Sequence, residues 1–373
     1  MGPLVIDVRA ADDLRDVVHR AVQVLAEGGL VALPTETVYG LAASALDPRA
    51  VERLLQAKGR PSGQPMTLAI KSADEARDYV PDMPPLAHRL ARRCWPGPIT
   101  LVLDSAHPES LVHRLPEQTR QAVSPGETIG LRVPGHEVVL DVLRLLVGPL
   151  VLSSANRSGR ADSVTAQEVL AELGDRVDLV LDDGECRYAK PSSVVRVHDG
   201  WYEVLRAGVV PEKTLQRLAS MMILLVCTGN TCRSPMAEAI CRRLVAEQLK
   251  CRGDELEDRG VVIASAGTSA AMGGWASPEA VQVVAEMGAS LEGHETQPLS
   301  EPLVRHADVI WTMTRAHRDA ILAQWPEAAA RTELLAPDGS DVPDPIGGPI
   351  ERYRQCAEQI RRHLERRIEQ LGW

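Results

Sequence analysis

The chain has 373 residues, of which 45% are hydrophobic and 25% charged, so it is long and apolar enough for two ordinary globular domains. Its formal net charge of −10 argues against a protein whose whole surface attracts nucleic acid or acidic membranes. Seven unevenly spaced cysteines without a CxxC pair argue against a disulfide framework and a zinc site. The N-terminus has acids where a signal peptide needs basic and apolar residues, and no apolar run is long enough to span a membrane. We therefore expect a cytoplasmic protein without a membrane partner.

The first half of the chain alternates segments with strand and helix patterns. Apolar residues at helical spacing predict helices at 13–29, 50–60, 84–95 and 211–220. Residues 30–38 predict a buried strand that runs into a turn at Pro34. Further buried apolar runs predict strands at 65–70, 99–104, 128–134, 149–156, 178–184, 192–197 and 201–208.

A second alternation starts after the tandem methionines Met221 and Met222. It predicts strands at 223–227, 261–268 and 308–313, and helices at 234–249, 277–288, 315–325 and 348–371. Regular alternation of this kind is typical of parallel strands covered by helices. We predict an α/β protein with two domains, residues 1–219 and 220–373.

The second half opens with a strand, a loop and a helix in "ILLVCTGNTCRSPMAEAI", residues 223–240. A helix that starts near Pro235 directs the loop amides at one point, which makes an anion site. Arg233 can offer a two-pronged contact to phosphate oxygens, and the positive surroundings favour a thiolate at Cys227. A nucleophilic sulfur beside a bound phosphate predicts phosphoryl transfer to Cys227, with Ser234 donating a hydrogen bond to it.

A leaving group needs a proton, and "DVPDPIGG" at 341–348 supplies two acids. Asp344 lies between two prolines, so we expect it to be held rigidly and to act as general acid and later as base toward water. Asp341 is the competing candidate.

These residues resemble the low-molecular-weight protein tyrosine phosphatase family. The resemblance covers 222–373 and rests on "VCTGNTCRSPMAEA", "SAGT" at 265–268, "ADVIWTMT" at 307–314 and "DVPDP". The family implies a flavodoxin-like parallel sheet, a phosphocysteine intermediate, a phosphoprotein substrate and no metal or cofactor. Its motif makes Cys227 the nucleophile, Arg233 the phosphate clamp and Asp344 the general acid. It makes loop supports and specificity residues of Thr228, Gly229, Asn230, Thr231, Cys232 and Ser234.

Two departures from the tyrosine-specific pattern concern the substrate. Thr231 stands where those enzymes usually have Ile or Leu, and Ile346, Gly347 and Gly348 replace aromatics after the Asp-Pro pair. This pattern resembles the protein-arginine phosphatase branch, since an aromatic wall rewards a flat phenyl ring. We therefore favour phosphoarginine over phosphotyrosine. Cys232 is either a resolving partner for an oxidised Cys227 or a small buried loop residue.

The first half carries polar residues at the ends of its predicted strands. "PTETVYGL" (34–41), "KGR" (58–60) and "SSAN" (153–156) supply hydroxyls, an amide and two cations, while Arg132 and Arg206 end later strands. Together they predict a concave site for a polyanion such as a nucleotide. No Walker-type phosphate loop is present.

These motifs, taken in the order in which they occur along the chain, resemble the YrdC-type threonylcarbamoyl-AMP synthase family over about 15–210. The family implies a twisted mixed sheet with helices and a reaction that joins L-threonine, bicarbonate and ATP, with Mg²⁺ accompanying the ATP. Its product serves the modification of adenosine 37 in tRNA, so tRNA or the tRNA-modifying transferase complex is a candidate partner. By motif match, threonine would be held by Thr35, Arg132, Ser154 and Ser192. ATP would be held by Lys58, Arg60, Gln64, Thr128, Asn156, Ser163 and Arg206, and no protein side chain is assigned to a metal.

The leading interpretation is therefore a fused enzyme with two activities. An alternative makes the first half a degenerate module that binds RNA or a nucleotide and regulates a working phosphatase. A third makes the loop at Cys227 an anion sensor without turnover.

Overall fold

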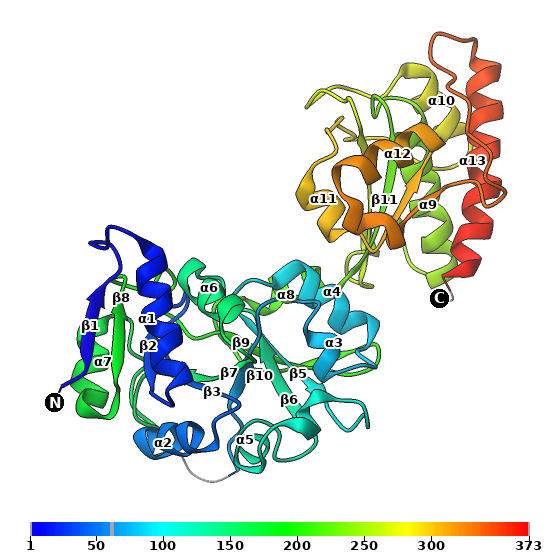
Figure 1. Cartoon of the computed structure of the whole chain (residues 1–373). Helices are drawn as coiled ribbons and strands as arrows, with labels where there is room; N and C mark the ends of the chain where they lie inside the picture. Colours follow the sequence, from blue (N-terminus) through cyan, green and yellow to red (C-terminus); the bar gives the residue numbers. More distant parts are fainter. Residues whose placement is uncertain (1, 60–62, 372–373) are drawn as a thin grey trace. The chain divides into compact units, whose positions relative to one another are not determined.

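The computed structural model describes residues 2–59 and 63–371, and the chain divides into two compact units, Met1–Leu218 and Ala219–Trp373 (Figure 1). The predicted boundary at 219/220 lies one residue after this division. Each unit has its own sheet and its own core, and each is described by itself.

The described residues of the first unit form a ten-stranded mixed sheet in the order β1-β8-β2-β3-β7-β4-β6-β5-β9-β10. Its strands are β1 (Leu4–Asp7), β2 (Val31–Leu33), β3 (Gly40–Ser44), β4 (Thr67–Ala69), β5 (Ile99–Asp104), β6 (Thr128–Arg132), β7 (Leu150–Ser154), β8 (Leu179–Asp182), β9 (Ser193–Val197) and β10 (Tyr202–Arg206). Its helices are α1 (Leu14–Ala26), α2 (Pro48–Lys58), α3 (Ala76–Tyr79), α4 (Pro85–Cys94), α5 (Glu117–Val123), α6 (Glu137–Leu145), α7 (Ala166–Leu173) and α8 (Glu212–Ala219). The predicted mixed sheet is confirmed, and β1, β3, α3, α5, α6 and α7 are additions to the predicted elements.

Local chemistry explains several of these boundaries. Asp47 caps α2 by accepting from the Arg49 and Ala50 amides, and Gly59 ends that helix in a left-handed conformation at φ 57°. β2 ends at Leu33, next to the turn predicted at Pro34, because the hydroxyl of Thr35 bonds to residues 37 and 38 and folds the chain into a buried turn. The chain then reverses into β3, which pairs antiparallel with β2. This turn places the "PTETVYGL" residues beside the sheet.

The described residues of the second unit form a four-stranded, all-parallel sheet in the order β12-β11-β13-β14. Its strands are β11 (Met221–Cys227), β12 (Val261–Gly267), β13 (Val309–Thr312) and β14 (Thr332–Leu334), and its helices are α9 (Arg233–Leu249), α10 (Pro278–Glu286), α11 (Glu301–His306), α12 (Arg315–Gln324) and α13 (Ile350–Gln370). The predicted parallel sheet is confirmed. In such sheets, ligands bind beyond the carboxyl ends of the strands, where the chain order reverses.

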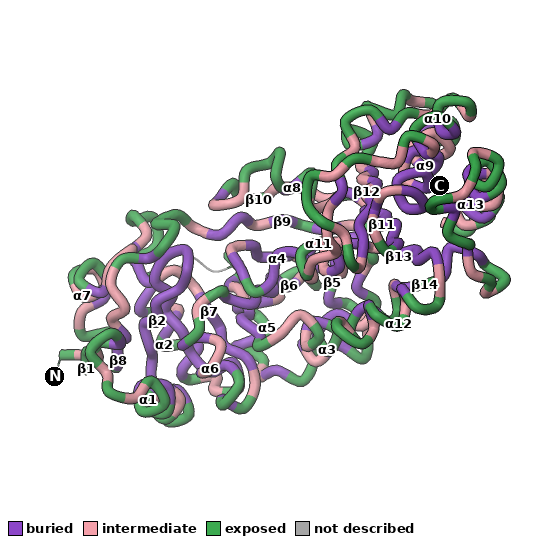
Figure 2. Tube along the Cα trace, turned by 90° about the horizontal axis from the view of Figure 1, so that it is seen from above, coloured by how far each residue is buried: buried purple, intermediate pink, exposed green. Residues whose placement is uncertain are grey.

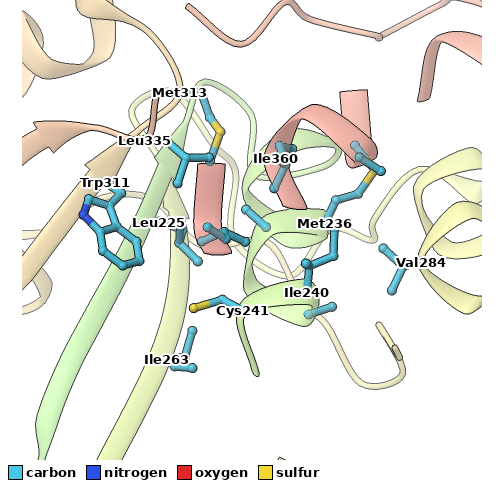
Figure 3. Packing of buried hydrophobic residues seen from close by; sticks show 14 of the residues in the cluster. Leu225, Met236, Ile240, Cys241, Ile263, Val284, Trp311, Met313, Leu335 and Ile360 are labelled. Atoms are coloured by element: carbon cyan, nitrogen blue, oxygen red, sulfur yellow. The ribbon is translucent and has the colours of Figure 1, made fainter. Parts of the chain in front are cut away.

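The core of the second unit lies between this sheet and α9, α10 and α13. Figure 3 shows Met236 and Ile240 of α9 packed among Leu225 of β11, Val284 of α10 and Ile360 of α13, and all five side chains are buried. Because α9 is apolar on most of its surface, it can be buried between the sheet and other helices. Figure 2 shows inner strands such as β2, β7 and β11 as buried and the outer faces of the helices as exposed, whereas β1 and β10 at the edges of the first sheet are mostly exposed. None of the helices in the described ranges is both long and apolar enough to cross a membrane.

Candidate active sites

The loop between β11 and α9 follows a buried parallel strand and ends at the N-terminus of a long helix. β11 ends at Cys227 and α9 begins at Arg233, so the loop amides lie at the carboxyl edge of the sheet. Asn230 adopts a left-handed backbone at φ 54°, which Asn tolerates better than most residues. A Cβ atom at Gly267 of β12 would lie 2.4 Å from the Thr228 carbonyl oxygen, so the loop requires glycine there.

The sulfur of Cys227 is buried and lies among hydrogen-bond donors of its own loop. Cys227 Sγ is 2.9 Å from Ser234 Oγ and accepts from the Asn230 amide at 3.3 Å. The Asn230 side chain donates to Ser234 Oγ at 3.0 Å and to Ser265 Oγ at 2.9 Å. The predicted pairing of Cys227 with Ser234 is thus present in the structure.

Further contacts fix Asn230 and its partner Ser265 from outside the loop. The backbone amide of Gln297 donates to Asn230 Oδ1 at 2.9 Å, and His294 Nε2 lies 3.0 Å from the Asn230 carbonyl oxygen. Ser265, which accepts from Asn230, itself donates to Glu238 at 2.6 Å. With every polar atom of the buried Asn230 side chain engaged, the loop has one well-defined shape.

Arg233 and Asp344 meet across the site, although 111 residues separate them. Arg233 Nη2 donates to Asp344 Oδ2 at 2.5 Å, and Nη1 donates to the Val342 carbonyl at 3.2 Å. The Arg233 side chain is 6% exposed and that of Asp344 is 40% exposed, so the carboxylate faces the opening while the guanidinium lies beneath it. The carboxylate of Asp341 does not meet Arg233 in this way: its Oδ1 accepts from the Arg315 backbone amide at the start of α12 at 2.9 Å.

The remaining predicted loop residues differ in exposure. Thr228 is exposed and Thr231 is half-buried, while Cys232 is buried with its sulfur 3.5 Å from Ser277 Oγ and 3.6 Å from the Tyr353 hydroxyl. Burial and the contact with Cys232 raise the pKa of Tyr353 to about 12. Gly229 is half-buried.

His317 also belongs to this site, although it is not among the predicted site residues. The residue is buried on α12, with Nε2 at 2.8 Å from Thr228 Oγ1 and Nδ1 at 2.9 Å from Thr314 Oγ1. Burial and the nearby positive charge of Arg233 lower the pKa of His317 to about 4, so its imidazole is neutral near pH 7. The signal that could have found it is the spacing of a helix-capping Thr and a His three residues later, "TRAH".

The first unit has a pocket of about 310 Å³ on one face of its sheet, lined by six of the predicted site residues. These six are Thr35, Thr128, Arg132, Ser154, Ser192 and Arg206. Thr35 lies in the buried turn after β2, Thr128 and Arg132 in β6, Ser154 in β7 and Arg206 in β10, and Ser192 directly precedes β9. In the sheet, β4 lies between β7 and β6, and β5 lies between β6 and β9. Gly130, which has no side chain, lies at the pocket between Thr128 and Arg132 on the same face of β6.

A buried ion pair holds Arg132 at the pocket. Arg132 Nη2 donates to Glu36 Oε1 at 2.8 Å and to Thr37 Oγ1 at 2.9 Å, and both charged side chains are 8% exposed. The other carboxylate oxygen, Glu36 Oε2, accepts from the Gly135 amide at 2.8 Å. Glu36 was missed because an acid next to threonines in a predicted turn gives no local sign that it is buried.

Lys58 lies behind Ser154 at the end of α2. Its ammonium group donates to the Ser154 carbonyl at 2.6 Å, to Ser154 Oγ at 3.4 Å and to Asn156 Oδ1 at 3.3 Å. Ser163 donates to the Ala155 carbonyl at 2.9 Å and so fixes the same segment. Lys58, Asn156 and Ser163 are buried beside the pocket rather than in its wall.

The opposite wall is built around Ser192. Arg206 Nη2 donates to the Ser192 carbonyl at 2.8 Å and to its hydroxyl at 3.1 Å, and Thr100 Oγ1 lies 3.1 Å from the same hydroxyl. Burial and the positive charge of Arg132 lower the pKa of Arg206. Thr100 was missed, although the two-residue period of its strand would have placed it on the face of the pocket.

The remaining predicted nucleotide contacts are Gln64 and Arg60. Gln64 is exposed and does not line the pocket. Arg60 lies outside the described residues. Within residues 2–59 and 63–371, no group of three or more His, Cys, Asp or Glu side chains is placed to hold a metal ion.

Comparison with known proteins matches each unit to a different family. A model of the Sua5/YciO/YrdC family, described as telomere recombination, matches residues 23–208. A model of low molecular weight phosphotyrosine protein phosphatases matches residues 222–372.

Relatives of the first unit are named as synthases. The chain is 36% identical over 193 residues to threonylcarbamoyl-AMP synthase of Pyrococcus abyssi, a match that covers 52% of this chain and 54% of that relative. The chain therefore spans about half the length of this curated relative. It is also 36% identical over 202 residues to a putative threonylcarbamoyl-AMP synthase of Mycobacterium tuberculosis, covering 54% of this chain and 87% of the relative. The structure of a double variant of Pyrococcus abyssi Sua5 is similar at a TM-score of 0.52 and 25% identity, covering 70% of this chain and 91% of that one.

Proposed function

Because the chain belongs to the threonylcarbamoyl-AMP synthase family through its first unit and to the low-molecular-weight phosphatase family through its second, we propose that it is an enzyme with two activities. The first is the synthesis of threonylcarbamoyl-AMP from L-threonine, bicarbonate and ATP. The second is hydrolysis of a phosphoprotein through a phosphocysteine.

The synthase proposal is carried by one observation, the convergence of six motif residues on a single pocket. Thr35, Arg132, Ser154 and Ser192 would hold threonine, with Arg132 facing its carboxylate. Arg206 and Thr128 would hold the nucleotide from the opposite wall, while Lys58 would neutralise phosphate charge. Mg²⁺ would arrive with ATP and take most of its ligands from the phosphates, since no cluster of acids among the described residues surrounds the pocket.

Pyrophosphate release by the full chain tests this proposal. We expect release from ATP only when threonine and bicarbonate are both present, and at least a tenfold loss in Lys58→Ala and Arg60→Ala. Lys71→Ala is the matched control, because Lys71 is exposed and does not line the pocket. Pyrophosphate release that ignores threonine, or that survives both substitutions, would instead favour the degenerate binding module. The tRNA or tRNA-modifying transferase complex remains the proposed recipient of the product.

The phosphatase proposal is carried by the placement of Arg233 between the nucleophile loop and Asp344. Cys227 would attack the phosphorus and Arg233 would hold the phosphoryl oxygens. Asp344, exposed above Arg233, would give a proton to the leaving group and then take one from water. Asp341 is less suited to this role, because its carboxylate is held by the first turn of α12.

We further propose that the substrate is phosphoarginine rather than phosphotyrosine. Support comes from the half-buried Thr231 in the loop and from Ile346 and Gly347, which leave no aromatic wall directly after Asp344 and Pro345. The test is the ratio of kcat/KM on phosphoarginine and phosphotyrosine peptides, for wild type, Thr231→Val and Thr231→Ile. We expect the wild type to prefer phosphoarginine and Thr231→Ile to reverse or flatten the ratio. A phosphotyrosine preference that neither substitution changes would refute the arginine assignment, and a phosphocysteine trapped at Cys227 would exclude an anion sensor.

A further inference from the structure

The first turn of α12 contacts both loops of the phosphatase site: the nucleophile loop, residues 227–233, and the acid loop, residues 341–348. His317 on this turn reaches Thr228, the residue after the nucleophile, and the Arg315 amide reaches Asp341 in the acid loop. The acid loop is held a second time, because the Val342 amide donates to the Met313 carbonyl at 2.8 Å. The same short segment therefore sets the position of the nucleophile loop relative to the acid loop.

We infer that His317 is a positioning residue for phosphoryl transfer, which holds the Thr228 side chain so that its hydroxyl hydrogen is presented to the oxyanion bound in the loop. This inference rests on the proposed phosphatase function. The hydroxyl of Thr228 would then contact the substrate directly, a role that its place in the loop motif does not by itself assign to it.

The hydrogen bonds around the Thr228 hydroxyl limit where its own hydrogen can point. Among the described residues, Thr228 Oγ1 has two partners, His317 Nε2 at 2.8 Å and Arg233 Nη2 at 3.4 Å. A guanidinium can only donate, so Arg233 uses an acceptor site of Thr228. A neutral imidazole has one donor and one acceptor, so the direction of the His317 contact depends on its tautomer.

Thr314 decides between the two tautomers. Its Oγ1 already accepts from the His317 backbone amide at 3.3 Å as the cap of α12. If Thr314 donates its hydrogen to His317 Nδ1, every polar atom of the pair is satisfied, and Nε2–H must donate to Thr228. The opposite arrangement leaves the Thr314 hydrogen without an acceptor among the described residues.

The favoured arrangement leaves one hydrogen unused. With both His317 and Arg233 donating to Thr228 Oγ1, the Thr228 hydroxyl hydrogen has no acceptor within the described protein. Thr228 is exposed and directly follows Cys227, so this hydrogen faces the space in which a phosphoryl group would lie. A donor fixed before substrate binds costs little reorganisation during the reaction.

The charged surroundings keep His317 in the neutral form that this arrangement needs. It faces Arg233 from α9 and the carboxylates of Asp344 and Asp341 from the acid loop, and burial outweighs the pull of those acids. An imidazolium at this position would be a second cation beside Arg233 and would have to donate to both threonines. Because His317 is neutral, it can orient Thr228 without adding a second positive charge to the site.

A mutant cycle on the full chain tests the inference, using Thr228→Val, His317→Ala and the double variant. The first readout is the affinity for inorganic phosphate measured by calorimetry, which needs no turnover. The second readout is kcat/KM on the phosphopeptides. We expect each single substitution to weaken phosphate binding about tenfold and the double variant to be no weaker than either, because both remove the same hydrogen bond. Thr228→Ser should bind like wild type, and His317→Gln should recover most of the loss, since its amide can both donate to Thr228 and accept from Thr314.

His363→Ala is the matched control, because His363 is a buried histidine of α13 in the same unit and no contact joins it to the loop among the described residues. Losses that multiply in the double variant would overturn the inference, as would a His317→Gln variant as weak as His317→Ala. Unchanged phosphate affinity in Thr228→Val would also overturn it, and this exposed substitution remains informative if His317→Ala does not fold. A wild type that binds phosphate but hydrolyses neither peptide would refute the proposed function and leave the cycle in phosphate affinity to judge the positioning role.

Discussion

Removing the carboxylate of Glu36 should damage both the stability and the chemistry of the first unit. In Glu36→Ala, Arg132 would lose its acidic partner, and the Gly135 amide would lose its acceptor. Both charged side chains are 8% exposed, so water cannot replace the carboxylate without opening the turn that follows β2. The guanidinium would remain buried without compensation.

The size of the effect follows from this geometry. Breaking a buried ion pair by removing one partner costs about 3–5 kcal/mol, since an unpaired charge stays in a poor solvent. The two lost contacts, at 2.8 Å each, are bonds to a charged group and account for a cost in that range. Asp141→Ala is the control: its partner Arg144 is 60% exposed, so little change is expected.

Hydrogen exchange followed by mass spectrometry can measure this effect for each unit separately. Peptides from β6 and β7 should exchange faster in Glu36→Ala by the factor that corresponds to the lost free energy, about a hundredfold or more. Peptides from β11 should be unchanged, because they report the second unit. The same variant should lose threonine-dependent pyrophosphate release. Exchange in β6 within a few-fold of wild type would refute the view that Glu36 holds Arg132 in place.

The other predictions concern the second unit. Because the pKa of His317 in the folded chain is about 4, below its ordinary value of 6.5, its neutral form contributes stability that is present above pH 6.5 and is lost as pH falls toward 4. The opening free energy of β11, obtained from exchange rates divided by the intrinsic rate at each pH, should therefore fall by up to about 3 kcal/mol over that window, and His317→Gln should remove this pH dependence. Cys227→Ser should abolish phosphopeptide hydrolysis and leave threonine-dependent pyrophosphate release unchanged; a parallel loss of both would contradict two separate sites. Mild peroxide should join Cys227 to Cys232 and spare Cys241, whose pKa burial raises strongly; mass spectrometry that finds only over-oxidised Cys227 would exclude the protective disulfide.

Long, strongly patterned elements could be predicted from the sequence. β11 is an unbroken apolar run that ends in a loop motif, and α9 and α13 have clear helical spacing. β3 was missed because "GLAAS" is made of small residues without alternation, and β14 because its three residues give no pattern. These short strands are formed by pairing with neighbours already in place, which no local window contains.

The site residues show the same division between local pattern and long-range partner. Thr35 lies in the turn after β2, Arg132 and Ser154 end β6 and β7, Ser192 directly precedes β9, and the structure brings all four to one pocket. Because β7 runs antiparallel to β4 and β4 parallel to β6, Arg132 and Ser154 end their strands at opposite edges of the sheet. Gln64 stands in a loop whose path depends on tertiary contacts, and it does not reach that pocket. A position next to a predicted strand therefore predicted membership of the pocket better than a motif match in a loop did.

What the sequence could not supply is the partner of each buried polar group. Arg132 on a buried strand requires an acceptor, since an unpaired charge there would be too costly, but its partner Glu36 is 96 residues away. Thr228 likewise pairs with His317 across 89 residues. In both cases the predicted site residue was recognised from its motif, whereas its partner was not selected: Glu36 lies inside the "PTETVYGL" motif and His317 lies on α12. Because orientation decides whether a donor meets the reacting atoms, the second group should matter to activity nearly as much as the first.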